Sequence, residues 1–125
     1  MAQVMIVDDQ INTANMLSMA VTMLGHEPLE LYRGEDALEM LRATQPDFIL
    51  LDFMMPGMNG LRTLEEMRTI PNCEHVPIFL LTAAQDHYLE EKAKKAGATG
   101  FLPKPLNLEI LETILRKNGN NGSRD

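Results

Sequence analysis

Five polar residues come directly after runs of apolar residues, and together they could bind a metal ion and a phosphoryl group. Asp8 and Asp9 follow the first apolar run, Asp52 follows a later one, and Thr82 and Lys104 stand after two more. Oxygen ligands without a nearby histidine or cysteine favour a hard cation, Mg²⁺ or alternatively Mn²⁺. A lysine and a hydroxyl beside that cation would bind the oxygens of a phosphoryl group.

Asp52 is the candidate nucleophile of this set. Three carboxylates close together raise one another's pKa unless a cation joins them, and a carboxylate can attack phosphorus to give an acyl phosphate. Asp52 ends the apolar run from Phe48 to Leu51, which is typical of a strand buried on both faces. It would therefore lie at the carboxyl end of a strand, where open parallel sheets bind their ligands.

Each of these residues also has an ordinary structural explanation. The Asp8-Asp9 pair is typical of a turn or a helix cap, Thr82 of a structural hydroxyl, and Lys104 of a solvated side chain. Independent surface residues, however, have no reason to follow four separate strands on one edge of a sheet. The joint pattern therefore favours a site.

The pattern of apolar residues predicts five strands that alternate with five helices. Short apolar runs predict strands over 4–7, 29–32, 48–51, 76–81 and 99–102, and spacings of three and four predict helices over 11–24, 37–41, 61–67, 89–96 and 108–115. That alternation indicates an α/β fold, a single doubly wound (βα)5 domain with a parallel sheet. All strand ends then share one edge, which brings the five polar residues together.

Several residues mark the predicted helix ends. Asn12 or Thr13 is expected to cap the first helix and Asn59 the third, while Gly25 and Gly97 suit the left-handed position after a helix. The outer side of the third helix is expected to carry four charged residues, namely Arg62, Glu65, Glu66 and Arg68. Residues 118–125 consist of Asn, Gly, Ser and charged residues, which predicts a disordered tail.

Composition narrows the class of protein. The 125 residues suffice for one domain, and 18 acidic against 11 basic residues give a net charge of −7, which disfavours direct binding of nucleic acid or of an anionic membrane. The single cysteine, Cys73, can form no internal disulfide and suits a reducing compartment. Without a membrane-length apolar run or a signal-peptide pattern, the sequence predicts a soluble, cytoplasmic protein.

Four ordered features resemble the receiver domain of bacterial two-component response regulators, including the chemotaxis regulators. They are Asp8-Asp9, the run from Leu51 to Gly60, Thr82-Ala83 and Lys104-Pro105. The resemblance covers residues 2–117 and implies a receiver domain over 1–117 with the flavodoxin-like strand order 2-1-3-4-5. Whether the chain is a stand-alone receiver or the front of a longer regulator stays open.

The resemblance implies a role for each site residue. Asp52 would accept a phosphoryl group from a sensor histidine kinase or a histidine phosphotransfer protein. The Mg²⁺ ligands would be Asp9, Asp52 and the backbone carbonyl of Met54, with Asp8 acting mainly through water. Thr82 and Lys104 would bind the phosphoryl oxygens.

The resemblance also implies a switch. Thr82 would move toward the phosphoryl group, Phe101 would turn into the vacated space, and the surface of the fourth helix, fifth strand and fifth helix would change for a downstream output protein or domain. The Lys104-Pro105 peptide bond is expected to be cis. Ile110 and Ile114 can support a phosphorylation-dependent homodimer, or they can complete the core.

Two other functions remain open at this point. A Mg²⁺-dependent phosphohydrolase with an aspartyl nucleophile would share much of this chemistry, but such enzymes usually carry a second acid two residues after the nucleophile, where this chain has Met54. A receiver-like binding scaffold that is never phosphorylated would keep the fold and lose the acids or the lysine, all of which are present. The expectation is a signalling domain that is not an enzyme and promotes only its own phosphorylation and dephosphorylation.

Overall fold

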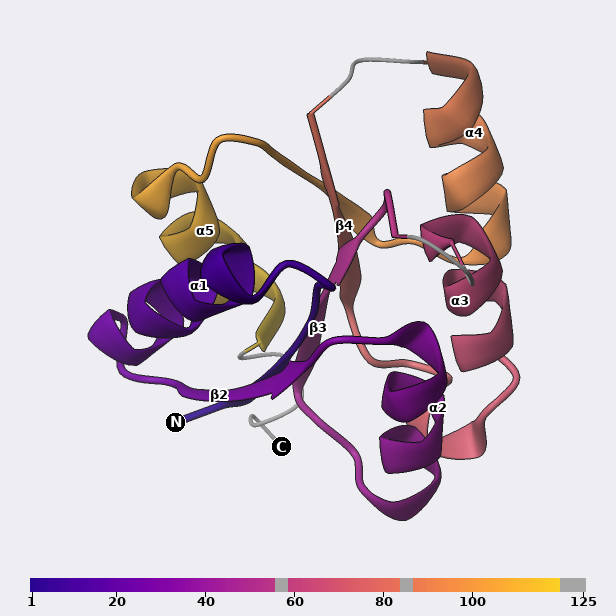
Figure 1. The fold of residues 1–125 in the computed structure, drawn as a ribbon, viewed down its shortest axis with the longest axis horizontal. Helices are drawn as coiled ribbons and strands as arrows, with labels where there is room; N and C mark the ends of the chain where they lie inside the picture. The colour runs from indigo at the N-terminus through magenta and orange to yellow at the C-terminus, as the bar shows by residue number, and fades with distance from the viewer. Residues whose placement is uncertain (56–58, 84–86, 120–125) are drawn as a thin grey trace.

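The computed structural model describes residues 1–55, 59–83 and 87–119, and it shows a five-stranded parallel sheet between two layers of helices (Figure 1). The strand order is β2-β1-β3-β4-β5, as predicted. The elements in chain order are β1 (Gln3–Val7), α1 (Ile11–Met23), β2 (Glu27–Leu31), α2 (Gly34–Ala43), β3 (Phe48–Asp52), α3 (Gly60–Met67), a 3₁₀ turn (Pro71–Cys73), β4 (Ile78–Thr82), α4 (His87–Ala96), β5 (Gly100–Pro103), α5 (Leu108–Ile114) and a π-helical turn (Leu115–Gly119).

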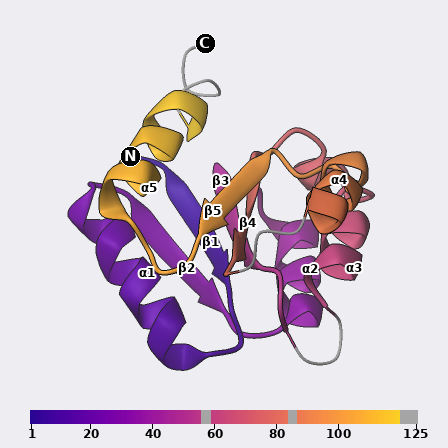
Figure 2. The ribbon, with the colours of Figure 1, turned by 90° about the horizontal axis from the view of Figure 1, so that it is seen from above.

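The two faces of the sheet carry separate hydrophobic cores. Helices α1 and α5 cover one face, and α2, α3 and α4 cover the other (Figure 2). Successive residues of a strand point to opposite faces, so Val4 and Ile6 of β1 join the core under α1 and α5, while Met5 and Val7 join the other core. Both faces of the central strands are therefore apolar, which explains why these strands have continuous apolar sequences.

Strand β3 is the centre of this arrangement. All five of its residues are buried, including the acid that ends it, whereas edge strand β2 has no fully buried residue. Pro28 is accommodated in β2 because an edge strand can lack one ladder donor. The apolar run before Asp52 is thus a strand buried on both faces, as the sequence predicted.

The predicted helix ends are correct in three cases and wrong in one. Asn59 caps α3, since its Oδ1 accepts a hydrogen bond of 2.9 Å from the Arg62 N–H. Gly25 and Gly97 have φ values of 90° and 115°, in the region that favours glycine. The predicted cap of α1 at Asn12 or Thr13 is wrong, because the helix already begins at Ile11.

Several boundaries also differ from the prediction, and two of the differences have a clear cause or consequence. Strand β4 begins at Ile78, two residues later than the apolar run suggests, since Pro77 has no N–H to donate to a ladder. At the other end, the π-helical turn includes Asn118, whose Nδ2 donates to the Ile114 carbonyl at 3.0 Å. The rest of the predicted tail, 120–125, lies outside the described residues, as do 56–58 of the Leu51 to Gly60 motif.

None of the helices in the described ranges combines the length and the apolar composition that a membrane crossing needs.

Candidate functional site

The predicted acids meet at the carboxyl edge of the sheet. Val7 of β1 lies opposite Leu51 of β3, so the residues that follow them, Asp8 and Asp52, leave the two neighbouring strands side by side. Asp8, Asp9 and Asp52 each offer a carboxylate oxygen, and these oxygens lie within 4.8 Å of one another. The sheet register thus brings together acids that are 44 residues apart in sequence.

Two of these acids are removed from solvent. Asp8 is 0% exposed and Asp52 is 2% exposed, while Asp9 is half-buried. The Oδ1 atom of Asp8 accepts a 2.9 Å hydrogen bond from the Gln10 N–H, but its Oδ2 atom is buried without a hydrogen-bond partner in the described structure. A buried carboxylate oxygen with no donor is costly, and a bound cation with its water ligands would satisfy it.

Burial also changes the proton affinity of the site. The pKa of the Asp8 carboxyl is raised to about 6, mainly by desolvation and in smaller part by the negative charge of Asp52. The Gln10 N–H and the positive charge of Lys104 act in the opposite direction. Asp8 is thus partly protonated near pH 6 when no metal is bound. A bound cation would instead favour the ionised carboxylate.

Lys104 supplies the positive charge of the site. Its Nζ lies 3.1 Å from Oδ1 of Asp52, and the Met54 N–H donates to the same oxygen at 3.2 Å. The pairing of β4 with β5 fixes the backbone position of the lysine, because the Lys104 N–H donates to the Thr82 carbonyl at 2.9 Å. The Lys104-Pro105 peptide bond is cis.

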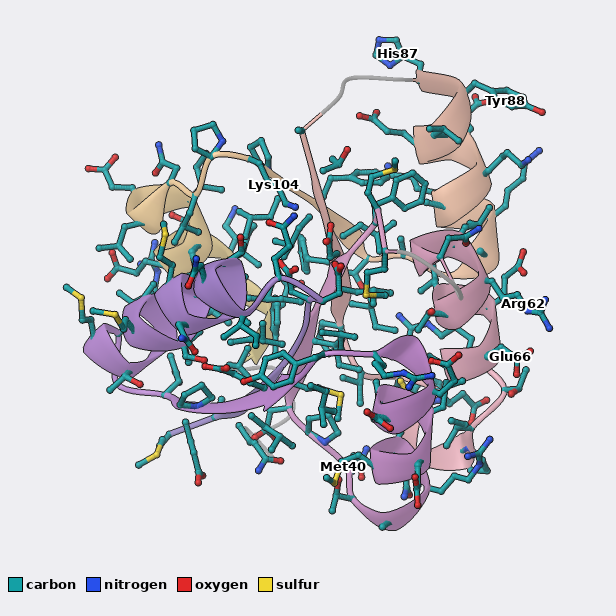
Figure 3. The ribbon with its side chains drawn as sticks, in the orientation of Figure 1. Met40, Arg62, Glu66, His87, Tyr88 and Lys104 are labelled. Carbon is teal, nitrogen blue, oxygen red and sulfur yellow. The ribbon has the colours of Figure 1, made fainter. Side chains whose placement is uncertain are left out.

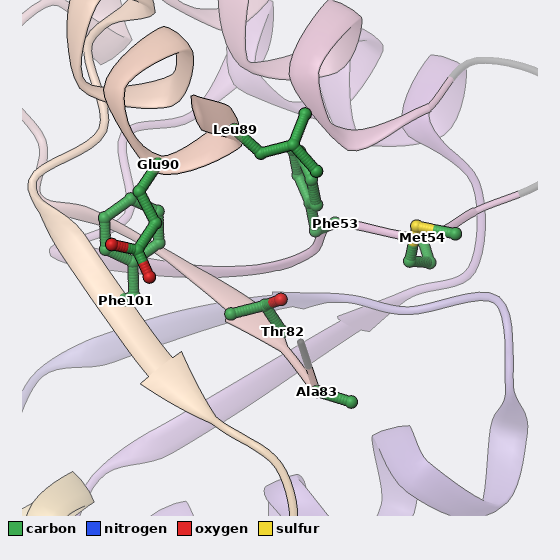
Figure 4. A pocket seen from close by; sticks show the side chains of 7 residues that line it. All are labelled: Phe53, Met54, Thr82, Ala83, Leu89, Glu90 and Phe101. Carbon is green, nitrogen blue, oxygen red and sulfur yellow. The ribbon is translucent and has the colours of Figure 1, made fainter. Parts of the chain in front are cut away.

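Thr82 faces a small cavity beside the acids. The cavity has a volume of about 150 Å³ and is lined by Phe53, Met54, Thr82, Ala83, Leu89, Glu90 and Phe101 (Figure 4). Thr82 ends β4 and Phe101 lies on β5, so the cavity is bounded by two strand ends and by the first turn of α4. The half-buried Phe101 ring therefore has open space next to it, on the side toward Thr82.

The structure brings the five polar candidate residues to one edge of the sheet, and Phe101 lies on β5 beside the cavity. It also adds groups that the sequence did not single out: the N–H groups of Gln10 and Met54, and the Leu89 and Glu90 side chains. The first two stand two residues after an aspartate, the usual position for a turn in which the carboxylate accepts from the backbone. Leu89 and Glu90 have no local sequence signal, since tertiary packing brings α4 to the cavity.

Comparison with known proteins gives a consistent result. A family model described as the response regulator receiver domain matches residues 4–116. The transcriptional regulatory protein AfsQ1 of Streptomyces coelicolor is 36% identical over 118 residues, which are 94% of this chain and 50% of AfsQ1. The probable chemotaxis protein CheY of Rhizobium etli is 32% identical over 114 residues, covering 90% of this chain and 88% of that protein. The chain therefore spans half of one relative and most of the other.

Solved structures share the same architecture. Chemotaxis protein CheY4 of Vibrio cholerae has a TM-score of 0.89 and 32% identity, covering 94% of this chain and 98% of that one. The receiver domain of the sensor histidine kinase PA1611 from Pseudomonas aeruginosa has a TM-score of 0.87 and 25% identity, covering 95% and 98%. That second structure holds a magnesium ion coordinated in its active-site cleft.

Proposed function

The chain belongs to the response regulator receiver domain family of two-component signalling, and we propose that Asp52 is the residue that accepts the phosphoryl group. One observation carries the proposal. Asp52 is a buried carboxylate that has a lysine ammonium at 3.1 Å and two further acids close enough to share a cation. A buried acid in such a setting is arranged for chemistry with an anionic group rather than for stability alone.

The proposed transfer starts from a phosphohistidine of a sensor histidine kinase or a histidine phosphotransfer protein. A carboxylate oxygen of Asp52 attacks the phosphorus, an acyl phosphate bond forms, and the P–N bond breaks with its electron pair on the donor imidazole. Lys104 moves from its contact with the carboxylate to the phosphoryl oxygens, where the Thr82 hydroxyl donates a further hydrogen bond. The domain promotes this reaction and its own dephosphorylation, and it acts on no separate substrate.

The acids fit a divalent metal. Receiver domains bind Mg²⁺ at an acidic pocket, and the cluster of Asp8, Asp9 and Asp52, with one unpartnered buried oxygen, has the hard oxygen ligands that Mg²⁺ or Mn²⁺ requires. We assign direct binding to Asp9, Asp52 and the Met54 carbonyl, with Asp8 acting through water. When bound, the ion would neutralise the carboxylates and the incoming phosphoryl oxygens.

The cavity between Thr82 and Phe101 supports a switch. Phosphorylation adds about 1.5 to 2 negative charges next to Thr82, which draws its hydroxyl toward the new oxygens. The Phe101 ring can then enter the cavity, and the α4-β5-α5 surface changes for a downstream protein or domain. Ile110 is 39% exposed on α5 and is available to a phosphorylation-dependent homodimer, whereas Ile114 packs against the core.

The remaining assignments follow from this role. We propose that 1–117 form the receiver, that it works in the cytoplasm, and that it contacts neither nucleic acid nor membrane directly. A phosphohydrolase is the less favoured function, because Met54 stands where a second acid would be needed and its side chain is 75% exposed. A scaffold without phosphorylation is less favoured still, since it would have no use for the buried acids.

Incubation with acetyl phosphate and Mg²⁺, followed by intact mass measurement, tests the proposal. Wild type should gain one phosphoryl group, and Asp52→Asn should gain none. Asp36→Asn, an exposed acid of α2, is the matched control and should behave as wild type. Equal phosphorylation of wild type and Asp52→Asn would show that Asp52 is not the acceptor, and turnover of p-nitrophenyl phosphate would favour a phosphohydrolase.

A further inference from the structure

The outer face of α4 has a composition unlike the rest of the chain. In a chain of net charge −7, residues 92–95 contain three of the 11 basic residues, namely Lys92, Lys94 and Lys95, and all three are exposed. Of the two acids in α4, Glu90 lines the cavity beside Phe101 (Figure 4), and Glu91 is exposed. The solvent face of this helix is therefore locally positive.

An aromatic ring completes this face. Tyr88 is 68% exposed and points away from the body of the protein at the start of α4 (Figure 3). The Lys92 Nζ lies over its ring, 5.2 Å from the centroid, a distance at which a cation and a ring attract each other. Tyr88, Lys92 and Lys95 are spaced by four and three residues, so they share one face of the helix, on which the two lysines outnumber the single acid, Glu91. We call these three residues the α4 stripe.

We propose that the α4 stripe binds an acidic segment of the downstream protein. Tyrosine and cationic side chains are frequent energetic centres of protein interfaces, and the two lysines provide charge complementarity to carboxylates. The contact of Lys92 with Tyr88 holds both side chains in place before binding, which reduces the entropy lost on association. This inference rests on the proposed function and names the kind of partner that its output surface recognises.

The stripe is connected to the phosphorylation site through its own helix. Leu89 and Glu90, which lie between the stripe residues in sequence, line the cavity that also contains Thr82 and Phe101. Ala93 is the one fully buried side chain that α4 contributes to the core. A change in the cavity can therefore shift the first turn of α4, and with it the position of Tyr88 relative to Lys95.

An acidic peptide fits this surface better than DNA or an anionic membrane does. Both of those carry charge over a large area, so they would also meet the acids that give the whole chain its net charge of −7. A short peptide covers only the stripe and its immediate surroundings. Acids farther away than about 8 Å repel it only weakly, because their charges are largely screened at physiological salt.

The test is an NMR titration of the ¹⁵N-labelled chain, without and with phosphorylation, using three twelve-residue peptides of the same leucine and phenylalanine content. One carries glutamates, one carries glutamines and one carries lysines in the remaining positions. The glutamate peptide should shift the amide signals of α4 and bind at least tenfold more tightly than the other two. Its affinity should increase on phosphorylation and decrease with added salt.

Two variants and a matched control locate the contact. Lys92→Gln/Lys95→Gln should weaken binding of the glutamate peptide roughly three- to tenfold, and Tyr88→Ala about tenfold. Arg116→Gln/Lys117→Gln removes the same charge from the opposite side of the sheet, after α5, and should leave the affinity within twofold (Figure 2). All variants should take up a phosphoryl group as wild type does, since none of these residues lies in the site.

The outcomes separate this inference from the proposed function. Normal phosphorylation by intact mass, together with equal binding of the three peptides or with signal changes outside α4, would overturn the inference alone. Tighter binding of duplex DNA or of phosphatidylserine vesicles than of the glutamate peptide would overturn it as well. Failure of phosphorylation would contradict the proposed function, and the unphosphorylated chain would still report whether the stripe binds acidic peptides.

Discussion

Helices α1 and α4 cover opposite faces of one sheet, and they are held there in different ways. Helix α1 buries four side chains, Ala14, Leu17, Ala20 and Val21, and has no charged residue in its 13 positions. Helix α4 buries Ala93 alone, and five of its ten residues are charged. The first helix is fixed by a continuous apolar face, whereas the second has little apolar surface to fix it.

The two ends of α4 are also unequal. Its first turn borders the cavity next to Thr82, but its last turn is followed by Gly97, whose carbonyl accepts hydrogen bonds from Nε and Nη2 of Arg68 at 3.0 and 2.7 Å. Nη1 of the same arginine donates to the carbonyls of Cys73 and Val76, both at 2.7 Å. Arg68 thus anchors the C-terminal end of α4, and the free space is at the end nearest the site. The switch proposed above needs one fixed face and one face that can shift, and the packing of α1 and of α4 is consistent with these two roles.

The largest difference between α1 and α4 is expected when one leucine of each helix is truncated to alanine. Leu17→Ala should reduce the free energy of unfolding by about 3 kcal/mol, because it leaves a cavity in the core under α1. Leu89→Ala should cost about 1 kcal/mol, because Leu89 is half-buried and already borders open space. Urea unfolding of both variants measures the difference, and equal losses would show that α4 is packed as firmly as α1.

The second prediction concerns the turn that leads into α1, where Asp8 accepts from Gln10. The folded pKa of Asp8, about 6, lies above its ordinary value of 3.8, so the folded state binds more protons than the unfolded state between these values. The metal-free domain should therefore lose stability as the pH rises from about 4 to 6, by about 3 kcal/mol at most.

Mg²⁺ should reverse this loss, and its stabilising effect should be larger at pH 7 than at pH 5 because ionised Asp8 is the form that a cation favours. Thermal unfolding across this range, with Mg²⁺ or with EDTA, measures both effects. Asp8→Asn is the control and should flatten the metal-free profile. An unchanged profile in that variant would assign the pH dependence to another group.

The next largest loss in the free energy of unfolding is expected for Arg68→Lys. A lysine keeps the charge but cannot reach the carbonyls of Gly97, Cys73 and Val76 together, so we expect a loss of about 2 kcal/mol. Hydrogen exchange should become faster in the last turn of α4 and remain unchanged in α1. If exchange increased equally in both helices, Arg68 would be a general stabiliser and not the anchor of α4.

The smallest effect should come from the exposed face of α1. Met19 is 66% exposed, and Met19→Gln should change the free energy of unfolding by less than about 0.5 kcal/mol. Thermal unfolding at neutral pH is sufficient to measure it. A loss above 1 kcal/mol would mean that the outer side of α1 also takes part in packing.

Much of this contrast could be predicted from the sequence, because it depends on local pattern. The continuous apolar run before Asp52 predicted a strand buried on both faces. The polar residues after four apolar runs predicted which side chains meet at the carboxyl edge of the sheet. The charged outer face of α4 is likewise visible in its sequence. Parallel strands place their ends on one edge whatever the loops between them do, so these inferences needed no detailed packing.

What could not be predicted depends on contacts between distant segments. Arg68 was expected on the outer, charged side of the third helix, and this is wrong: it lies just after α3, half-buried, and donates to carbonyls from two other segments. Burial lowers the pKa of its guanidinium, an effect that no local sequence feature indicates. The cavity beside Phe101 is similarly a gap between three elements, and its size follows from how they pack.

Hydrogen exchange of α1 and α4 in the same sample tests the central claim most directly. The chain is incubated with acetyl phosphate and Mg²⁺, its phosphorylation is checked by intact mass, and Asp52→Asn and Thr82→Ala are treated in parallel. We predict that phosphorylated wild type changes its exchange in α4 and not in α1, that Thr82→Ala is phosphorylated without the change in α4, and that Asp52→Asn shows neither. Phosphorylation of Asp52→Asn, or a change in α1 equal to that in α4, would contradict the account.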